Sequence, residues 1–356
     1  YKDIAEKLKE DTIDLEFRKS LAIKAFSHTA YYDAKIANYL NDKNLPEVLT
    51  IATKKANSLR YGENPHQNAA SYISRDSKTS VLCAKQIQGK ELSYNNINDA
   101  DAALRMVMEY EKPAAIGVKH TNPCGAATAD NILTAYKKAY EADSKSIFGG
   151  IVALNRPINE LVAKELIKIF LDVVIAPKVS EEAKLILSQK KNMRVLEIDM
   201  KEKANKVEVK SVLGGYLVQE SDNLPMVDEP WEIVTGKELD KKEIEDVQFA
   251  WKLIKHVKSN SIVVVKDKAT LGIGCGQVNR IDAAKYALDR GSDKCKGAVL
   301  ASDGLFPFDD VVKEAAKYGI KTIIQPGGSI RDQESIDAAK EFGITMVFTK
   351  TRHFKH

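Results

Sequence analysis

The feature that most constrains the fold is a regular alternation of short apolar runs with helical patterns, which begins near Thr50. The expected strands of the first part are SVLCAK, AAIGVKH, GGIVALN, VVIAP and RVLEID. Between them lie NDADAALRMVMEY, NILTAYKKAYEA, ELVAKELIKIF and SEEAKLILSQ, in which apolar residues recur at helical spacing. Such alternation predicts an α/β layered fold in which helices cover a largely parallel sheet.

The alternation resumes in the second part of the chain, although the two parts are too different in sequence to form a recognisable repeat. After a polar, lysine-rich stretch at 201–206 come VEVKSVLGGYLVQE, a helical VQFAWKLIKHV, and the runs SIVVVKD, LGIGCG, GAVLASD, TIIQP and TMVFTK. In each half an apolar strand ends in a short polar loop before a helix, as in IVALNRPINE and VLASDGLFPFDD. A chain of 356 residues also exceeds the usual size of one hydrophobic core. We therefore predict two similarly built α/β units.

The first forty residues differ from the rest because they show a helical pattern without strands. NDKNLPEV, at 41–48, breaks this pattern with Asn, Asp and Pro. The predicted divisions are a helical segment at 1–48, a first α/β unit at 49–206 and a second at 207–356. The helical segment is too small to hold a core alone, and the start at Tyr1 suggests a fragment of a longer protein.

Composition excludes several classes of function. The net charge of +4 is mild, and no long Lys/Arg tract with interleaved aromatics is present, which argues against a nucleic-acid partner. No apolar run has the length of a bilayer span, and no signal peptide is visible, so we expect no membrane partner. The cysteines Cys83, Cys124, Cys275 and Cys295 are scattered without a CxxC, which favours a reducing, cytoplasmic location.

The stretch GVKHTNPCGAA places Lys119 and His120 together at the end of an expected buried strand. A histidine that stands alone at a strand end is usually structural. Beside a lysine, like charge keeps the imidazole neutral and able to accept a proton near pH 7. We interpret the two residues as a catalytic pair that acts next to an anion. Zinc is excluded at Cys124, because a deaminase-type site needs a second cysteine in PCxxC and an upstream HxE.

Four further loops carry polar residues that suit binding: LRYGENPHQ, LSYNNINDADA, the region from KSNSIVVVKD to LGIGCGQVNRIDAA, and the terminal TKTRHFKH. Each also has a structural interpretation. Asn96 or Asn98 suits a helix N-cap, Arg60 suits a surface ion pair, and terminal residues are usually frayed. GIGCG lacks the GxGxxG spacing and the later acidic residue of a dinucleotide site.

Together these motifs resemble the transformylase part of the AICAR transformylase/IMP cyclohydrolase family. The matching stretches run in order from LRYGENPHQ, SYNNINDADAA, VKHTNPCGAA, SIFGGIVALNRPI, DVVIAP and KSNSIVVV to GIGCGQVNRIDA, SDGLFPFDD, QPGGSIRD and TRHFKH. The resemblance implies two cytidine-deaminase-like units without zinc, preceded by a helical remnant of the cyclohydrolase domain. It implies formyl transfer from 10-formyltetrahydrofolate to the 5-amino group of AICAR, with cyclohydrolase activity expected to be absent from this chain.

The same resemblance assigns roles to single residues. His120 would be the general base, and Lys119 would poise it and stabilise charge on the formyl oxygen. The residues implied for AICAR are Arg60, Tyr61, Asn96, Phe148, Asp172, Asn260, Arg280, Arg352 and His356; those implied for the folate are Pro307, Asp310 and Ser329. Leu305 stands where some relatives have an aromatic residue, which puts stacking on AICAR there in doubt.

The resemblance also implies a homodimer with sites at the subunit interface. It implies no catalytic metal and leaves room for a structural potassium ion. Two other functions stay open on the sequence. One is a nucleotide-dependent oxidoreductase whose cofactor binds at GIGCG. The other is a non-catalytic nucleotide-binding module, in which Lys119 and His120 would be replaceable.

Overall fold

The protein is described by a computed structural model that covers residues 1–74, 79–201, 207–223, 231–236 and 238–356. Its contacts divide the chain into two compact units. The smaller unit comprises Tyr1–Ser58, Ala70–Asp76 and Asn205–Ser221, and the larger comprises Leu59–Ala69, Ser77–Ala204 and Asp222–His356. Most of the lysine-rich stretch of the sequence, residues 202–206, lies outside the described residues.

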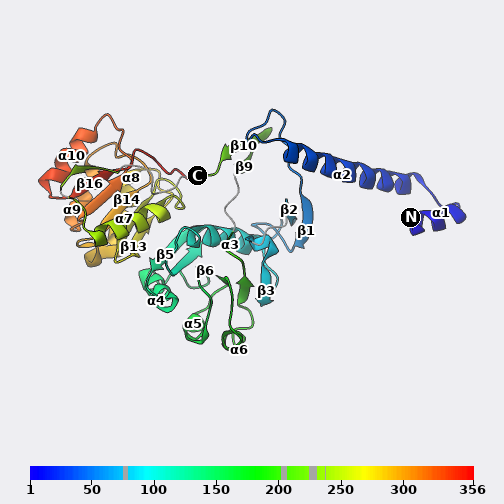
Figure 1. Ribbon diagram of the computed structural model, residues 1–356, viewed down its shortest axis with the longest axis horizontal. Coiled ribbons are helices and arrows are strands. Elements are labelled where there is room, and N and C mark those ends of the chain that lie inside the picture. The colour runs from blue at the N-terminus through cyan, green and yellow to red at the C-terminus, as the bar shows by residue number, and fades with distance from the viewer. Residues whose placement is uncertain (75–78, 202–206, 224–230, 237) are drawn as a thin grey trace. The chain divides into compact units, whose positions relative to one another are not determined.

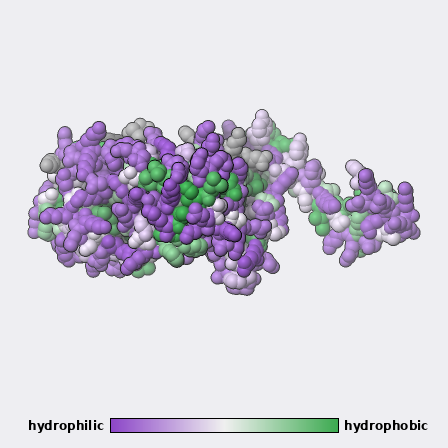
Figure 2. All heavy atoms as spheres, turned by 90° about the horizontal axis from the view of Figure 1, so that it is seen from below, coloured by the Kyte–Doolittle hydropathy of each residue, from purple (hydrophilic) through white to green (hydrophobic). Residues whose placement is uncertain are grey.

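The smaller unit is built around the expected N-terminal helical segment, which consists of two helices. Helix α1 spans Lys2–Lys9 and α2 spans Leu15–Leu40, and α2 begins where Phe17 N donates to the Asp14 carboxylate at 2.7 Å. Neither helix buries a residue, and Figure 2 shows green spheres among the purple ones on this segment. The unit also holds a hairpin of β9 (Val207–Val212) and β10 (Gly215–Glu220). A further two-stranded sheet pairs β1 (Lys54–Leu59) with β2 (Ala69–Ile73).

The larger unit contains one sheet, which has 12 strands among the described residues. Their order is β11-β16-β15-β14-β12-β13-β5-β4-β6-β7-β8-β3. The bounds are β3 Lys85–Gln88, β4 Ala114–Lys119, β5 Asn122–Thr128, β6 Ile151–Leu154, β7 Val173–Ala176, β8 Arg194–Glu197, β11 Glu232–Thr235, β12 Ile262–Lys266, β13 Ala269–Gly274, β14 Val299–Ser302, β15 Thr322–Gln325 and β16 Thr345–Phe348.

The sheet is mixed, so the prediction of a largely parallel sheet was wrong. Parallel pairing joins β6, β7 and β8 in one half and β14, β15 and β16 in the other. The middle of the sheet is antiparallel, because β4–β5 and β12–β13 are hairpins closed by two-residue turns. Two local predictions also fail. The residues Asn122–Gly125, interpreted as part of a polar loop after the strand, begin strand β5, and SVLCAK, expected as a strand, contains a 3₁₀ turn at Val81–Cys83 before β3.

Helices cover both faces of this sheet. Helices α3 (Tyr94–Val107) and α7 (Lys241–Ile254) pack with residues of both halves in one shared core. The opposite face carries two separate cores. These lie under α4 (Ile132–Ala142), α5 (Glu160–Leu166) and α6 (Glu181–Leu187), and under α8 (Arg280–Gly291), α9 (Asp310–Lys317) and α10 (Asp332–Glu341). Neighbouring strand residues serve different cores because successive side chains point to opposite faces.

The two halves of the larger unit have the same order of elements, although they share one sheet. In each half a long helix precedes a hairpin, and the hairpin is followed by a helix and by two strand–helix units. In Figure 1 the elements of the first half are coloured cyan to green and those of the second half yellow to red. Two contacts join residues 147 positions apart, Glu109 with His256 and Asp143 with Arg290. Side chains at equivalent positions of the two halves therefore contact each other where the halves join.

The halves are joined edge to edge by β5 and β13. Ala127 is paired with Ala269 across this junction. Thr128 N donates to Lys268 O at 2.9 Å, and Ala126 N donates to Thr270 Oγ1 at 3.0 Å. These bonds make the two half-sheets continuous.

We expect Gly125→Ala and Gly272→Ala to lower the stability of the larger unit. A Cβ at Gly125 would lie 2.1 Å from the Ala139 carbonyl oxygen of α4, and one at Gly272 would lie 1.9 Å from that of Ala287 on α8. Overpacking against backbone costs about 1–3 kcal/mol or more of unfolding free energy. Urea unfolding measures the loss. Gly215→Ala is the control, because nothing lies within 4 Å of its added Cβ; equal effects at all three glycines would contradict the packing argument.

We expect His256 to make stability depend on pH. His256 Nε2 lies 2.9 Å from Glu109 Oε1, and burial lowers the pKa of His256 from its ordinary value of 6.5, an effect that Glu109 only partly offsets. As pH falls below 6.5 the unfolded chain takes up this proton before the folded chain does, so stability declines until the folded pKa is reached. Urea midpoints at about pH 7.5 and about pH 5.5 should therefore differ less in His256→Gln than in the wild type. His28→Gln, on exposed α2, should leave the difference unchanged.

Candidate functional site

The turn between β4 and β5 presents the predicted catalytic pair. Lys119 is the last residue of β4 and is paired with Asn122, the first of β5. His120 and Thr121 form the two-residue turn between them, with φ of 53° and 62°. Left-handed backbone at both central residues defines a type I′ turn, for which Asn-Gly is preferred. A residue with a Cβ costs about 1–2 kcal/mol in this conformation, so other contacts must hold the turn.

Hydrogen bonds from one acidic side chain hold both residues of the turn. Asp99, on α3, accepts from His120 N at 3.1 Å through Oδ2 and from Thr121 N at 2.7 Å through Oδ1. The His120 carbonyl accepts from Thr121 Oγ1 at 2.7 Å and from Asn122 Nδ2 at 3.0 Å. Sequence reasoning missed Asp99 and Asn122, because nothing in the sequence shows that α3 passes beside this turn.

The side chains of the pair differ in their surroundings. Lys119 is half-buried, and its Nζ donates to the Phe148 carbonyl at 2.8 Å, which uses one of its three donors. His120 is exposed. The Phe148 side chain is 57% exposed, and its ring lies 5.7 Å from the ring of Phe170. The structure thus joins the expected residues Lys119, His120 and Phe148 at one place.

Two more expected residues, Asn96 and Asp172, contact each other directly. Asn96 Nδ2 donates to Asp172 Oδ2 at 3.0 Å, and Arg194 Nη1 donates to Asp172 Oδ1 at 3.2 Å. Asn96 also belongs to the capping box of α3, although the N-cap itself is Ser93. Because Asn96 precedes Asp99 by three residues on the same helix, both lie on one face of α3. Asn96 is therefore not the N-cap but the third residue of the helix, and its bonds within the capping box leave its Nδ2 directed to Asp172.

The loop with Arg60 and Tyr61 reaches the start of the same helix. Asn95 Nδ2 donates to the Glu63 carbonyl at 3.3 Å, which ties the loop to α3. The Arg60 guanidinium lies 5.1 Å from the centre of the Tyr61 ring, and Arg60 is exposed. No ion pair is found for Arg60 within the described ranges, so the surface ion-pair interpretation has no support.

A second cluster forms around Arg280, at the start of α8. Its guanidinium is buried and donates to Asp303 Oδ1 at 2.5 Å, to Ser302 Oγ at 2.8 Å and to Asn260 Oδ1 at 2.8 Å. The expected pair Asn260 and Arg280 is therefore in direct contact. Arg280 is neutralised by Asp303, so in this arrangement it orients Asn260.

The C-terminal segment is held against this cluster. Ser259 N donates to Lys355 O at 2.9 Å, Lys355 N donates to Ser259 Oγ at 3.1 Å, and His353 N donates to Asp303 O at 3.0 Å. His353 is buried, with its ring 4.9 Å from that of Trp251. The interpretation of this segment as a frayed tail is wrong, because its backbone and one side chain are fixed by neighbours.

This docking leaves the two expected C-terminal site residues on the surface. Arg352 and His356 are exposed on either side of Phe354, with the Arg352 guanidinium 4.6 Å and the His356 ring 5.9 Å from the Phe354 ring. Because Lys355 pairs with Ser259, both residues lie beside the Asn260 segment.

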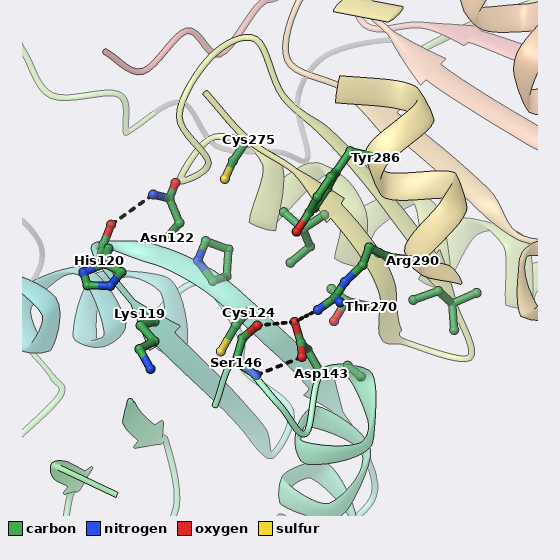
Figure 3. A pocket seen from close by; sticks show the side chains of 15 residues that line it. Lys119, His120, Asn122, Cys124, Asp143, Ser146, Thr270, Cys275, Tyr286 and Arg290 are labelled. Atoms are coloured by element: carbon green, nitrogen blue, oxygen red, sulfur yellow. Dashed lines mark hydrogen bonds and ion pairs between the residues drawn. The ribbon is translucent and has the colours of Figure 1, made fainter. Parts of the chain in front are cut away.

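Asn122 links the two clusters. Its Oδ1 accepts from Lys258 N at 3.2 Å while its Nδ2 donates to the His120 carbonyl. Beside this link lies a cavity of about 330 Å³, whose lining side chains are drawn in Figure 3. Its lining includes Lys119, His120, Asn122, Cys124, Cys275, Tyr286 and Arg290, which come from both halves. On one wall the Asp143 carboxylate accepts from Ser146 and Arg290 (Figure 3).

The expected folate residues form a separate group. Pro307 is exposed, Asp310 begins α9, and the Ser329 hydroxyl accepts from Arg331 N at 3.2 Å. The Arg331 guanidinium lies 5.0 Å from the centre of the Phe308 ring, which brings the two loops together. In the part of the chain that the structure describes, neither loop bonds to Lys119 or His120.

The described residues contain no cluster of three or more His, Cys, Asp or Glu side chains that could hold a metal ion. None of their helices is both long and apolar enough to cross a membrane.

Comparison with known proteins decides the family. The family model of the AICARFT/IMPCHase bienzyme matches residues 1–290. The chain belongs to the AICARFT/IMPCHase bienzyme family. Bifunctional purine biosynthesis protein PurH of Thermoanaerobacter sp. (strain X514) is 54% identical over 361 residues, covering 100% of this chain and 71% of that protein. The proteins of the same name from Oceanobacillus iheyensis and Anoxybacillus flavithermus are 50% and 52% identical, again over 100% of this chain and 71% of theirs. Membership of the bienzyme family places the chain among enzymes of purine biosynthesis.

In this member of the bienzyme family we expect Cys124 to be chemically inert. Burial, followed by the charge of Asp143, raises the pKa of the Cys124 thiol to about 12. At about pH 8 the thiolate, which is the reactive form, is on the order of one molecule in ten thousand. Iodoacetamide labelling followed by peptide mass spectrometry should modify exposed Cys83 long before Cys124. Both should react alike in urea, and equally fast labelling of the two in the folded protein would contradict the burial argument.

Proposed function

We propose that this chain transfers a formyl group from 10-formyltetrahydrofolate to the 5-amino group of AICAR. The products are formyl-AICAR and tetrahydrofolate, in the de novo synthesis of IMP. One observation supports the proposal most strongly: a strained, two-residue turn presents an exposed histidine beside a lysine at the edge of a cavity. Strained backbone of this kind is concentrated at functional sites. Because the chain belongs to the AICARFT/IMPCHase bienzyme family, we assign formyl transfer to this turn.

The reaction needs a proton acceptor and a stabiliser of negative charge. The amine of AICAR is a poor nucleophile, so His120 takes its proton as the nitrogen attacks the formyl carbon. A C–N bond forms, and the carbonyl oxygen becomes an oxyanion that the Lys119 ammonium stabilises. Collapse of this intermediate breaks the bond between the formyl carbon and N10, and the proton held by His120 passes to N10, so that tetrahydrofolate leaves and His120 is neutral again. The bond from Lys119 Nζ to the Phe148 carbonyl fixes the ammonium before substrate binds.

The nucleotide is assigned to the exposed cations around the two clusters. Arg60 and Arg352 offer guanidinium groups to the phosphate, and such charge-assisted contacts are strong. We assign Tyr61, Asn96, Phe148, Asp172 and His356 to the walls of the nucleotide site. Arg280 serves differently from the sequence prediction, since it holds Asn260 toward the substrate and itself bonds to Asp303.

The folate is assigned to the paired loops that carry Pro307, Asp310 and Ser329. Arg331 and Phe308 extend this surface, because their contact joins the loops. Leu305 is half-buried and supplies an aliphatic contact where some relatives stack an aromatic ring.

The oxidoreductase alternative loses its support in the structure. Gly272 and Gly274 of GIGCG lie in strand β13, where an added Cβ would lie 1.9 and 2.0 Å from carbonyl oxygens of α8. These glycines permit close packing of strand on helix. They do not form the loop that cradles a pyrophosphate.

Three further features belong to the proposal through the family resemblance alone. The chain works as a homodimer in the cytoplasm, with active sites at the subunit interface. Any potassium ion is structural and takes no part in the chemistry. Ring closure to IMP is assigned to other parts of the family's bienzyme and not to this chain. Sedimentation at several protein concentrations tests the dimer.

The decisive test is an absorbance assay for tetrahydrofolate formation with AICAR and the formyl donor. His120→Ala should lower kcat by about 10²- to 10⁴-fold, because general-base catalysis contributes that much, and should leave AICAR affinity nearly intact. His28→Ala, on α2, is the matched control and should retain full activity. Near-native turnover of His120→Ala would refute the role of His120 as general base and would favour the alternative of a non-catalytic nucleotide-binding module. If IMP formed at a rate proportional to the enzyme concentration, the proposal that this chain carries out formyl transfer without ring closure would be refuted.

A further inference from the structure

We propose that Asp99 is a positioning residue that fixes the backbone of the His120–Thr121 turn and thereby aims His120 at the substrate. The inference rests on the proposed function for its catalytic consequence. Asp99 makes both of its turn contacts through backbone N–H groups, so its carboxylate need not touch the substrate.

The turn needs such a support because its sequence is unfavourable. Both residues have positive φ, and Thr121 is β-branched, which makes a left-handed conformation an outlier. The hydrogen bond from Thr121 Oγ1 to the His120 carbonyl is internal to the turn and cannot orient it relative to α3. The two bonds to Asp99 do so, since α3 is anchored in the core by Ala103 and Met106.

The second half of the sheet contains the same device without the catalytic pair. Asp246, on α7, accepts from Asp267 N at 3.0 Å and from Lys268 N at 2.6 Å, and Asp267 and Lys268 have φ of 53° and 55°. In both halves the aspartate precedes the first turn residue by 21 positions. The chain therefore carries two copies of one structural element.

The side chains on the second turn form ion pairs. Asp267 pairs with Lys242 at 2.5 Å, and Lys268 pairs with Glu245 at 2.6 Å. Removal of Asp246 thus disturbs a turn that carries ion pairs, whereas removal of Asp99 disturbs a turn that carries His120. A comparison of variants at the two aspartates therefore distinguishes a structural role from a positioning role within one protein.

The experiment compares Asp99→Ala with Asp246→Ala, and Asp99→Asn with Asp246→Asn, in the full chain. Formyl-transfer kinetics give kcat and the KM for AICAR and for the folate, and urea unfolding gives stability. We expect Asp99→Ala to lower kcat about 10- to 100-fold with little change in either KM, because small misplacements of a reacting group have effects of this size. Asp99→Asn, which keeps one acceptor oxygen, should recover part of kcat. The Asp246 variants should keep kcat while losing as much stability as the Asp99 variants.

Amide hydrogen exchange supplies a readout that does not depend on the reaction. Exchange at the His120 and Thr121 amides should accelerate in Asp99→Ala and not in Asp246→Ala. Unchanged exchange at these amides, unchanged kcat in Asp99→Ala, or an equal loss of kcat in both alanine variants would overturn the positioning role. A wild-type chain with no formyl transfer would instead overturn the proposed function and, with it, the catalytic consequence of the turn.

Discussion

The larger unit depends on the antiparallel pairing of β5 with β13. This pairing turns two half-sheets into one and lets α3 and α7 share a core on one face. Gly125 and Gly272 leave no side chain between each of these strands and its covering helix, so α4 and α8 pack closely on β5 and β13. The cavity beside His120 takes its lining from both halves for the same reason. A weaker junction would separate Asn122 from Lys258 and divide the candidate site.

The halves share a framework and differ in what their hairpin turns present. Each has a capped helix, an aspartate that holds a left-handed turn, and a lysine at the end of the preceding strand. Lys119 Nζ donates to Phe148 O, and Lys266 Nζ donates to Lys296 O, so even the lysine contacts correspond. The two halves differ at the two turn positions, which are His-Thr in one half and Asp-Lys in the other, and the proposed chemistry rests on this difference. The rest of the framework provides rigidity to both.

The arginines expected in the site are of two kinds, buried and exposed. Around Arg280 the cation is buried and neutralised by Asp303, which suits a group that orients neighbours. Arg60 and Arg352 are exposed, and each guanidinium group lies over an aromatic ring. Exposed guanidinium groups are free to contact an anion, whereas the charge of Arg280 is already neutralised, and the sequence motifs alone do not show this difference.

The sequence by itself determined the α/β class, the two similar halves, the N-terminal helices and the proximity of Lys119 to His120. These follow from local periodicity and from adjacency in the chain, which act over a few residues. Only the tertiary structure decided that the sheet is mixed, that the C-terminal segment is docked, that Arg280 is occupied by Asp303, and that Asp99 lies under the turn. Each of these depends on contacts between residues far apart in the chain, where apolar periodicity carries no information about partners. The identity of the group that holds His120 was therefore hidden until the fold placed α3 beside it.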